Sequence, residues 1–152
     1  MATLKTHVSL NVTNLHKSVT FYHAMFGVSP VKYKADYAKF DLANPPLNLT
    51  LELNPNIMHS GGTLSHLGVQ VETTEDVQAQ IKRFQAAGLE VLEEKNTHCC
   101  YAIQDKVWVS DPDGNRWEVF VVNVEDTAPD LNLKITDNSQ QESNTVTSSC
   151  CG

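Results

Sequence analysis

The sequence has no long apolar run, no basic stripe and no export signal. No stretch of about 18 consecutive apolar residues occurs, which argues against a membrane-spanning helix. The formal net charge is −7, and a chain this acidic without a basic patch is not expected to bind nucleic acid. The segment MATLKTHVSLNV alternates apolar and polar residues and lacks the apolar block of a signal peptide. We therefore expect a cytoplasmic protein.

Cysteine is scarce, and its spacing excludes the common structural roles. The four cysteines form two adjacent pairs, Cys99-Cys100 and Cys150-Cys151. Adjacent cysteines close a disulfide only in a strained ring, and neither pair has the spacing of a CxxC redox motif or a zinc finger. Because thiols stay reduced in the cytoplasm, we interpret these residues as ligands or nucleophiles.

Aromatic residues are absent from the last part of the chain. Residues 125–152 are rich in Ser, Thr, Asn and Gln, and their acidic residues outnumber the one base, Lys134. Such a segment cannot bury enough apolar surface to offset the entropy of ordering it. We predict one folded domain over residues 1–124 and a disordered acidic tail over 125–152 that ends in Cys-Cys-Gly.

The folded part contains a repeat of low identity. His7–Gly27 and His66–Gly88 each open with a histidine, followed by a strand-like alternation, a polar turn with capping residues, an amphipathic helix and a glycine. Strand-like segments follow each helix. We predict two β-α-β-β-β modules, over about 4–55 and 65–123, joined by a linker at 56–64.

The strands after each helix follow from short apolar and alternating segments. In the first module they are expected at 30–34, 37–42 and 47–53, and in the second at 89–94, 100–104, 106–110 and 116–122. The sequence DPDGN at 111–115 is typical of a tight turn between strands. The predicted fold class is α+β, with a curved mixed sheet around a metal cup.

A metal site is expected where the two repeats meet. His7 and His66 open equivalent strands, and Glu118 lies in the last strand, in NRWEVFVV. Two imidazoles and one carboxylate form the facial set of non-haem Fe(II) oxygenases, which leaves positions for substrate and dioxygen. Glu52, in LNLTLELN, is a candidate fourth ligand.

The histidine-led repeat and DPDGNRWE (111–118) together resemble the vicinal oxygen chelate superfamily. Its members include glyoxalase I, extradiol dioxygenases, fosfomycin-inactivating enzymes and bleomycin-binding proteins. Three segments, ADYAKFDLANPPLNLTLELNP (35–55), GGTLSHLGVQVE (61–72) and THCCYAIQDKVWVSDPDGNRWEVF (97–120), look like those of Fe(II)-dependent carbon–arsenic lyases.

That resemblance implies a substrate and a set of site residues. It implies that Cys99 and Cys100 bind a trivalent organoarsenical, that His7, His66 and Glu118 hold iron, and that dioxygen is the co-substrate. Trivalent arsenic is soft and prefers thiolates, and two neighbouring sulfurs chelate it at little further entropic cost.

The geometry of adjacent cysteines adds a constraint. In a regular strand they would point to opposite faces, so we predict that EEKNTHCC forms a loop that closes on the substrate. Tyr101 and Gln104 are candidate accessory residues. Cys150 and Cys151 could capture the metalloid first and pass it inward.

Two other functions remain open. A glyoxalase I-like isomerase would use Glu52 as a fourth ligand but leaves the pair Cys99-Cys100 unexplained. A metal-free binding protein would sequester the arsenical without releasing a product. The sequence also leaves open whether the chain prefers methyl or aryl arsenicals and whether it is a monomer or a homodimer.

Overall fold

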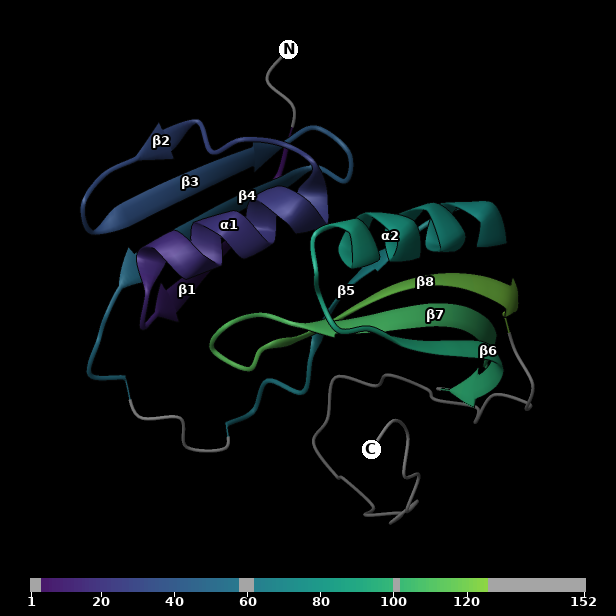
Figure 1. Cartoon of the computed structure of the whole chain (residues 1–152). Helices are drawn as coiled ribbons and strands as arrows, with labels where there is room; N and C mark the ends of the chain where they lie inside the picture. Colours follow the sequence, from purple (N-terminus) through teal and green to yellow (C-terminus); the bar gives the residue numbers. More distant parts are fainter. Residues whose placement is uncertain (1–3, 58–61, 100–101, 126–152) are drawn as a thin grey trace, which may run out of the picture.

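The computed structural model describes residues 4–57, 62–99 and 102–125 (Figure 1). The predicted tail therefore lies outside the described residues except for Glu125. No helix within the described ranges is long and apolar enough to cross a membrane. The elements are β1 (Thr6–Val12), α1 (Leu15–Phe26), β2 (Lys32–Tyr33), β3 (Tyr37–Leu42), β4 (Leu47–Leu53), β5 (Leu67–Gln70), α2 (Thr74–Ala86), β6 (Leu92–Cys99), β7 (Ala102–Ser110) and β8 (Arg116–Val124).

The predicted repeat is confirmed as two β-α-β-β-β modules that lie side by side in Figure 1. Each module has one four-stranded sheet, with strand orders β1-β4-β3-β2 and β5-β8-β7-β6. The first and last strands of each module pair in parallel, and the other pairs are antiparallel. The fold is therefore α+β with mixed strand pairing, as the sequence predicted, and the strands form two four-stranded sheets.

Local capping explains where the two helices begin. The Asn14 side chain accepts a hydrogen bond from the backbone N–H of Lys17 at 3.0 Å, which satisfies one of the free donors at the start of α1. Thr73 and Asp76 form a reciprocal capping box at the start of α2. At the end of α1, Gly27 has φ 69°, the left-handed conformation that glycine adopts without strain and that commonly ends a helix.

The prediction was wrong for residues 93–99 and for the break expected at Asp105. The segment EEKNTHCC, expected as a loop, is strand β6 as far as Cys99, and the expected strands 100–104 and 106–110 are one strand, β7, that begins at Ala102. Strand β6 is polar because it lies at the edge of its sheet, where one side of the strand meets solvent. The strand continues through Asp105, which accepts hydrogen bonds from Asn96 of β6 and Thr74 of α2, and through Lys106, which pairs with the buried Glu118 of β8.

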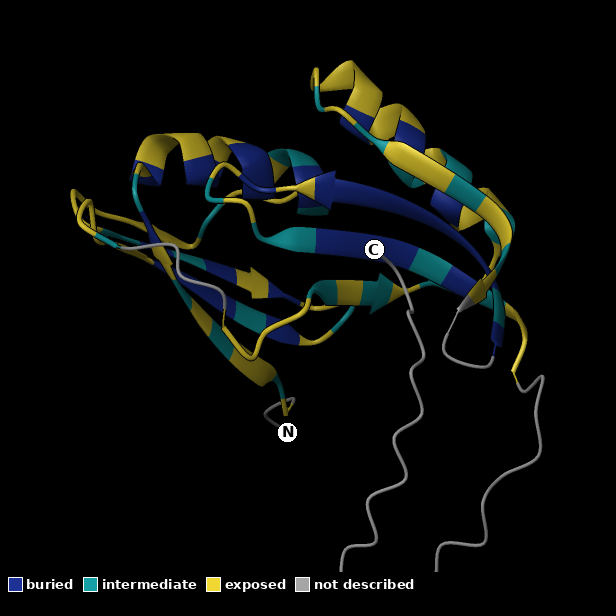
Figure 2. Cartoon of the chain, turned by 90° about the horizontal axis from the view of Figure 1, so that it is seen from below, coloured by how far each residue is buried: buried dark blue, intermediate teal, exposed yellow. Residues whose placement is uncertain are grey.

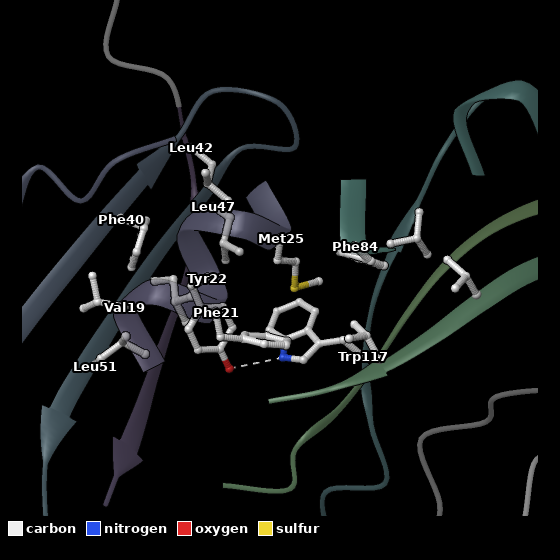
Figure 3. Packing of buried hydrophobic residues seen from close by; sticks show 14 of the residues in the cluster. Val19, Phe21, Tyr22, Met25, Phe40, Leu42, Leu47, Leu51, Phe84 and Trp117 are labelled. Carbon is white, nitrogen blue, oxygen red and sulfur yellow. Dashed lines mark hydrogen bonds between the residues drawn. The ribbon is translucent and has the colours of Figure 1, made fainter. Parts of the chain in front are cut away.

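A single apolar cluster spans both modules. Buried and exposed residues alternate along both helices, as Figure 2 shows, and the buried apolar ones belong to this cluster. Trp117 of β8 lies at the junction, with its ring 6.0 Å from that of Tyr22 and 5.7 Å from that of Phe26. Figure 3 shows Met25 and Phe84 beside it. The two modules therefore share one core.

Polar contacts around the 111–115 turn tie the modules together. The Tyr22 hydroxyl donates to Asp111 at 2.6 Å and accepts from the Trp117 indole at 3.2 Å. Burial, and next the charge of Asp111, raise the pKa of Tyr22 far above its usual value, so this hydroxyl remains a donor. The carboxylate of Asp113 accepts from the backbone N–H of Thr13, just ahead of α1.

Candidate functional site

The candidate site lies on the face of the second sheet opposite α2, which we call the distal face. Side chains alternate along a strand, and Val107, Val109, Trp117, Val119 and Val121 enter the core beside α2. The residues between them belong to the distal face. The register places Trp108 beside Glu118 and Lys106 beside Phe120 on this face.

His66 and Glu118 meet on the distal face. His66, directly before β5, has its Nε2 atom 3.4 Å from Oε1 of Glu118, and its Nδ1 lies 2.9 Å from the Ser65 hydroxyl. Its ring makes an edge-to-face contact with Trp108, with centroids 5.1 Å apart. These contacts aim Nε2 at the carboxylate, the arrangement in which a second partner orients a metal-binding histidine.

The separation of these two atoms is suitable for a shared metal ion. Donor atoms about 2.1 Å from one ion and at right angles to each other lie about 3 Å apart. The 3.4 Å between His66 Nε2 and Glu118 Oε1 is close to that value. Nitrogen and carboxylate oxygen are also donors that a divalent transition metal accepts.

Gly68 makes room for the Glu118 side chain. The two residues are register partners on β5 and β8. A Cβ atom at position 68 would lie 2.9 Å from Cγ of Glu118 and 3.3 Å from its Oε1. Any side chain at this position would therefore displace the carboxylate.

A buried lysine holds the other oxygen of the carboxylate. Lys106 is 1% exposed, and its ammonium group lies 3.0 Å from Oε2 of Glu118 and 5.4 Å from the centre of the Trp108 ring. This ion pair leaves Oε1 facing His66. Lys106 was not predicted from the sequence, in which a single lysine within a strand carries no signal of burial.

Two buried polar atoms of β7 have no protein partner among the described residues. They are Oε1 of Gln104 and Nε1 of Trp108, on either side of Lys106. Buried polar groups are rarely left in this state unless water or a ligand satisfies them. Gln104 was predicted as an accessory residue, and the structure places it on the same row as Lys106.

The guanidinium of Arg116 lies over the Trp108 ring, with its Cζ atom 4.3 Å from the ring centre.

The other predicted ligands lie in the first module. His7, on β1, has Nδ1 3.1 Å from the backbone oxygen of Asn48. Glu52, on β4, accepts a hydrogen bond from Ser9 at 3.1 Å. Within the described ranges, no three side chains of His, Cys, Asp or Glu are grouped closely enough to hold one ion. The structure thus brings two predicted ligands together, His66 and Glu118, and neither His7 nor Glu52 joins them.

The predicted substrate thiols lie mostly outside the described residues. Cys100, Tyr101, Cys150 and Cys151 are not described. Cys99 is the last residue of β6, and its register partner is Ala102. Ala102 begins the row of β7 that continues through Gln104 and Lys106, so the last residue of β6 is paired with a residue of the distal face.

Comparison with known proteins identifies the class. The sequence model of the Glyoxalase/Bleomycin resistance protein/Dioxygenase superfamily matches residues 6–119, and the chain belongs to this family. The resemblance inferred from the sequence is therefore confirmed.

Individual proteins similar to this chain carry more specific names than the family. The chain is 54% identical over 115 residues to the trivalent organoarsenical cleaving enzyme of Bacillus sp. (strain MD1), which covers 75% of this chain and 70% of the relative. It is 42% identical over 149 residues to the probable trivalent organoarsenical cleaving enzyme of Bacillus subtilis (strain 168), covering 95% and 97%. It is 48% identical over 118 residues to the cadmium-induced protein CadI of Mycobacterium tuberculosis (strain ATCC 25618 / H37Rv), covering 78% and 76%.

Solved structures agree on the fold. A glyoxalase/bleomycin resistance protein/dioxygenase from Alicyclobacillus acidocaldarius superposes with a TM-score of 0.64 at 14% identity, covering 78% of this chain and 91% of the other. The fosfomycin resistance protein FosX from Listeria monocytogenes superposes with a TM-score of 0.59 at 20% identity, covering 80% and 94%. At these identities the likeness concerns the fold alone.

Proposed function

We propose that this chain is an Fe(II)-dependent dioxygenase that cleaves the carbon–arsenic bond of trivalent organoarsenicals. The observation that carries the proposal is the His66–Glu118 pair, 3.4 Å apart on the sheet whose edge strand ends at Cys99. The organoarsenical-cleaving relatives support the substrate class.

In this proposal His66 and Glu118 hold the iron, with His7 as the third ligand. Since His7 lies apart from them in the structure, its ligation requires movement of the first module or a second copy of the chain. Iron, when bound, supplies the site at which dioxygen is activated. Ser65 orients His66, and Lys106 holds one carboxylate oxygen so that the other remains directed at the metal position.

The substrate is held by sulfur in this proposal. Cys99 and Cys100 exchange the two hydroxyl groups of the arsenical for thiolate bonds and position its carbon. For methylarsenite the overall reaction is CH3As(OH)2 + O2 → CH2O + As(OH)3. Carbon loses four electrons, dioxygen gains four, and arsenic remains trivalent, so no further reductant is needed.

An oxygen-dependent release of arsenite tests this function. We expect protein loaded anaerobically with Fe(II) and methylarsenite to produce arsenite and formaldehyde in equal amounts once air is admitted. Arsenic speciation measures the arsenite, and a colorimetric aldehyde assay measures the formaldehyde. Cys99→Ser should abolish turnover at low substrate, whereas Glu52→Gln should leave it unchanged.

Each contrary outcome has a definite meaning. Arsenite formed without oxygen, or no arsenite at all, would reject the dioxygenase. Loss of activity in Glu52→Gln would favour the glyoxalase I-like isomerase, and stoichiometric binding without product would favour a sequestering protein. The Cys150→Ser/Cys151→Ser variant shows whether the second thiol pair takes part in delivery.

A substitution at Gly68 tests the metal position separately. Gly68→Ala places a methyl group against the Glu118 side chain, and we expect Fe(II) affinity to fall about tenfold, since disturbed ligand support has effects of this size. Gly62→Ala is the matched control because a Cβ there meets nothing within 4 Å. Equal Fe(II) affinity of the two variants in anaerobic titration would place the metal away from Glu118.

A further inference from the structure

Strand β6 contains a β-bulge close to its end. Lys95 and Asn96 together lie opposite the single residue Asp105 of β7, while the register is regular up to Glu94 and resumes at Thr97. Asn96 has φ 47°, in the left-handed region that asparagine tolerates better than most residues. A bulge of this kind bends the strand and changes the direction of the residues that follow it.

The carboxylate of Asp105 holds this bulge. Its Oδ1 accepts the backbone N–H of Asn96 at 2.8 Å, and its Oδ2 accepts the hydroxyl of Thr74, the first residue of α2, at 2.8 Å. Asp105 is 8% exposed. The N–H of Asn96 lowers the pKa of this carboxyl, so it is ionised at neutral pH and binds the amide as a charged acceptor.

The bulge decides which residues of β6 align with the distal face. With the extra residue, Cys99 is paired with Ala102, which lies in the same row of β7 as Lys106. Without the extra residue, regular pairing from Glu94 onward would pair His98 with Ala102 instead. A shift of one residue exchanges the two faces of a strand, so the bulge sets the alignment of the segment that leads into the thiol pair.

We propose that Asp105 is a positioning residue for the substrate thiols. By holding the bulge at Asn96, its carboxylate sets the register of the strand that carries Cys99. Asp105 touches neither metal nor substrate in this role and acts only through β6. The inference rests on the proposed function, in which Cys99 and Cys100 bind the arsenical.

Thiol capture in the absence of metal tests the role of Asp105. The full chain with Cys150→Ser/Cys151→Ser, free of iron, is titrated with phenylarsine oxide, and affinity is measured by calorimetry. We expect Asp105→Ala to bind about tenfold more weakly, because loss of a hydrogen bond to a charged group has an effect of this order. Asp76→Ala, which removes the capping box of α2 and leaves β6 intact, should bind as the parent does.

Asn96 variants test the bulge itself. Asn96→Gly should retain the parent affinity because glycine adopts a positive φ without strain, whereas Asn96→Val should weaken binding as Asp105→Ala does. In Asp105→Ala, hydrogen exchange at the amide of Asn96 should accelerate. Equal affinities for Asn96→Gly and Asn96→Val, or parent affinity for Asp105→Ala, would overturn the positioning role.

The failure of the two proposals can be told apart. If the parent does not capture phenylarsine oxide, or captures it equally well after Cys99→Ser, the thiol site of the proposed function is rejected. If the parent captures it through Cys99 and Asp105→Ala does so equally well, only the positioning role is rejected.

Discussion

Replacing Glu118 with leucine is expected to lower the free energy of unfolding by about 3–5 kcal/mol, the range observed when one member of a buried ion pair is removed. The substitution takes the carboxylate away from an ammonium group that is 1% exposed, that of Lys106. Denaturant unfolding of the metal-free protein measures this effect separately from any contribution of iron.

A second substitution separates stability from metal binding. In the double variant Glu118→Leu/Lys106→Met the buried charge is removed as well, and apolar replacement of a buried ion pair is often neutral or stabilising. We expect its unfolding free energy to return close to that of the parent, and the proposed function predicts that neither variant binds iron or releases arsenite. A single variant Glu118→Leu as stable as the parent would contradict the buried ion pair.

Replacing Trp117 with alanine is expected to cost about 3–5 kcal/mol of unfolding free energy, as large-to-small changes of aromatic core residues do. Trp117 is 2% exposed, packs against rings of α1 and donates to the Tyr22 hydroxyl. Because this side chain lies between the modules, its removal leaves a cavity where the two halves of the core meet (Figure 3).

Two control variants define what Trp117 contributes. Trp117→Phe keeps an aromatic ring in the core and should cost less than the alanine change, since it loses the hydrogen bond and part of the buried area. Leu92→Ala, at a position 55% exposed, should alter stability little. If Trp117→Ala were no more destabilising than Leu92→Ala in denaturant unfolding, the shared core would be refuted.

Much of the fold was predictable because its signals are local. The repeated order of alternation, capping residues, helical periodicity and glycine predicted both modules. In the structure the two helices are capped by Asn14 and Thr73, which lie in the polar turns of the repeat. Local patterns failed at residues 93–99, where polarity suggested a loop, and at Asp105, where a break between two strands was expected. There the hydrogen bonds of an edge strand, the contacts of Asp105 with Asn96 and Thr74, and the buried ion pair of Lys106 with Glu118 outweighed polar composition.

The candidate site was predictable only in part. His66 was selected from the repeat and Glu118 from its place in the last strand after DPDGN, and the structure places the two side chains together. Lys106 was missed because an isolated lysine in a strand gives no sign that its ammonium group will be buried against a carboxylate. His7 has the equivalent place in the first repeat, but a repeat in sequence does not fix the distance between modules.

The sequence by itself determined the two-module architecture, the family and the choice of His66 and Glu118, because each depends on residue order and spacing. Only the tertiary structure decided the burial of Lys106, the close approach allowed by Gly68 and the bulge that aligns Cys99 with Ala102. These features arise from contacts between strands distant along the chain, where the register and a single extra residue determine which side chains meet.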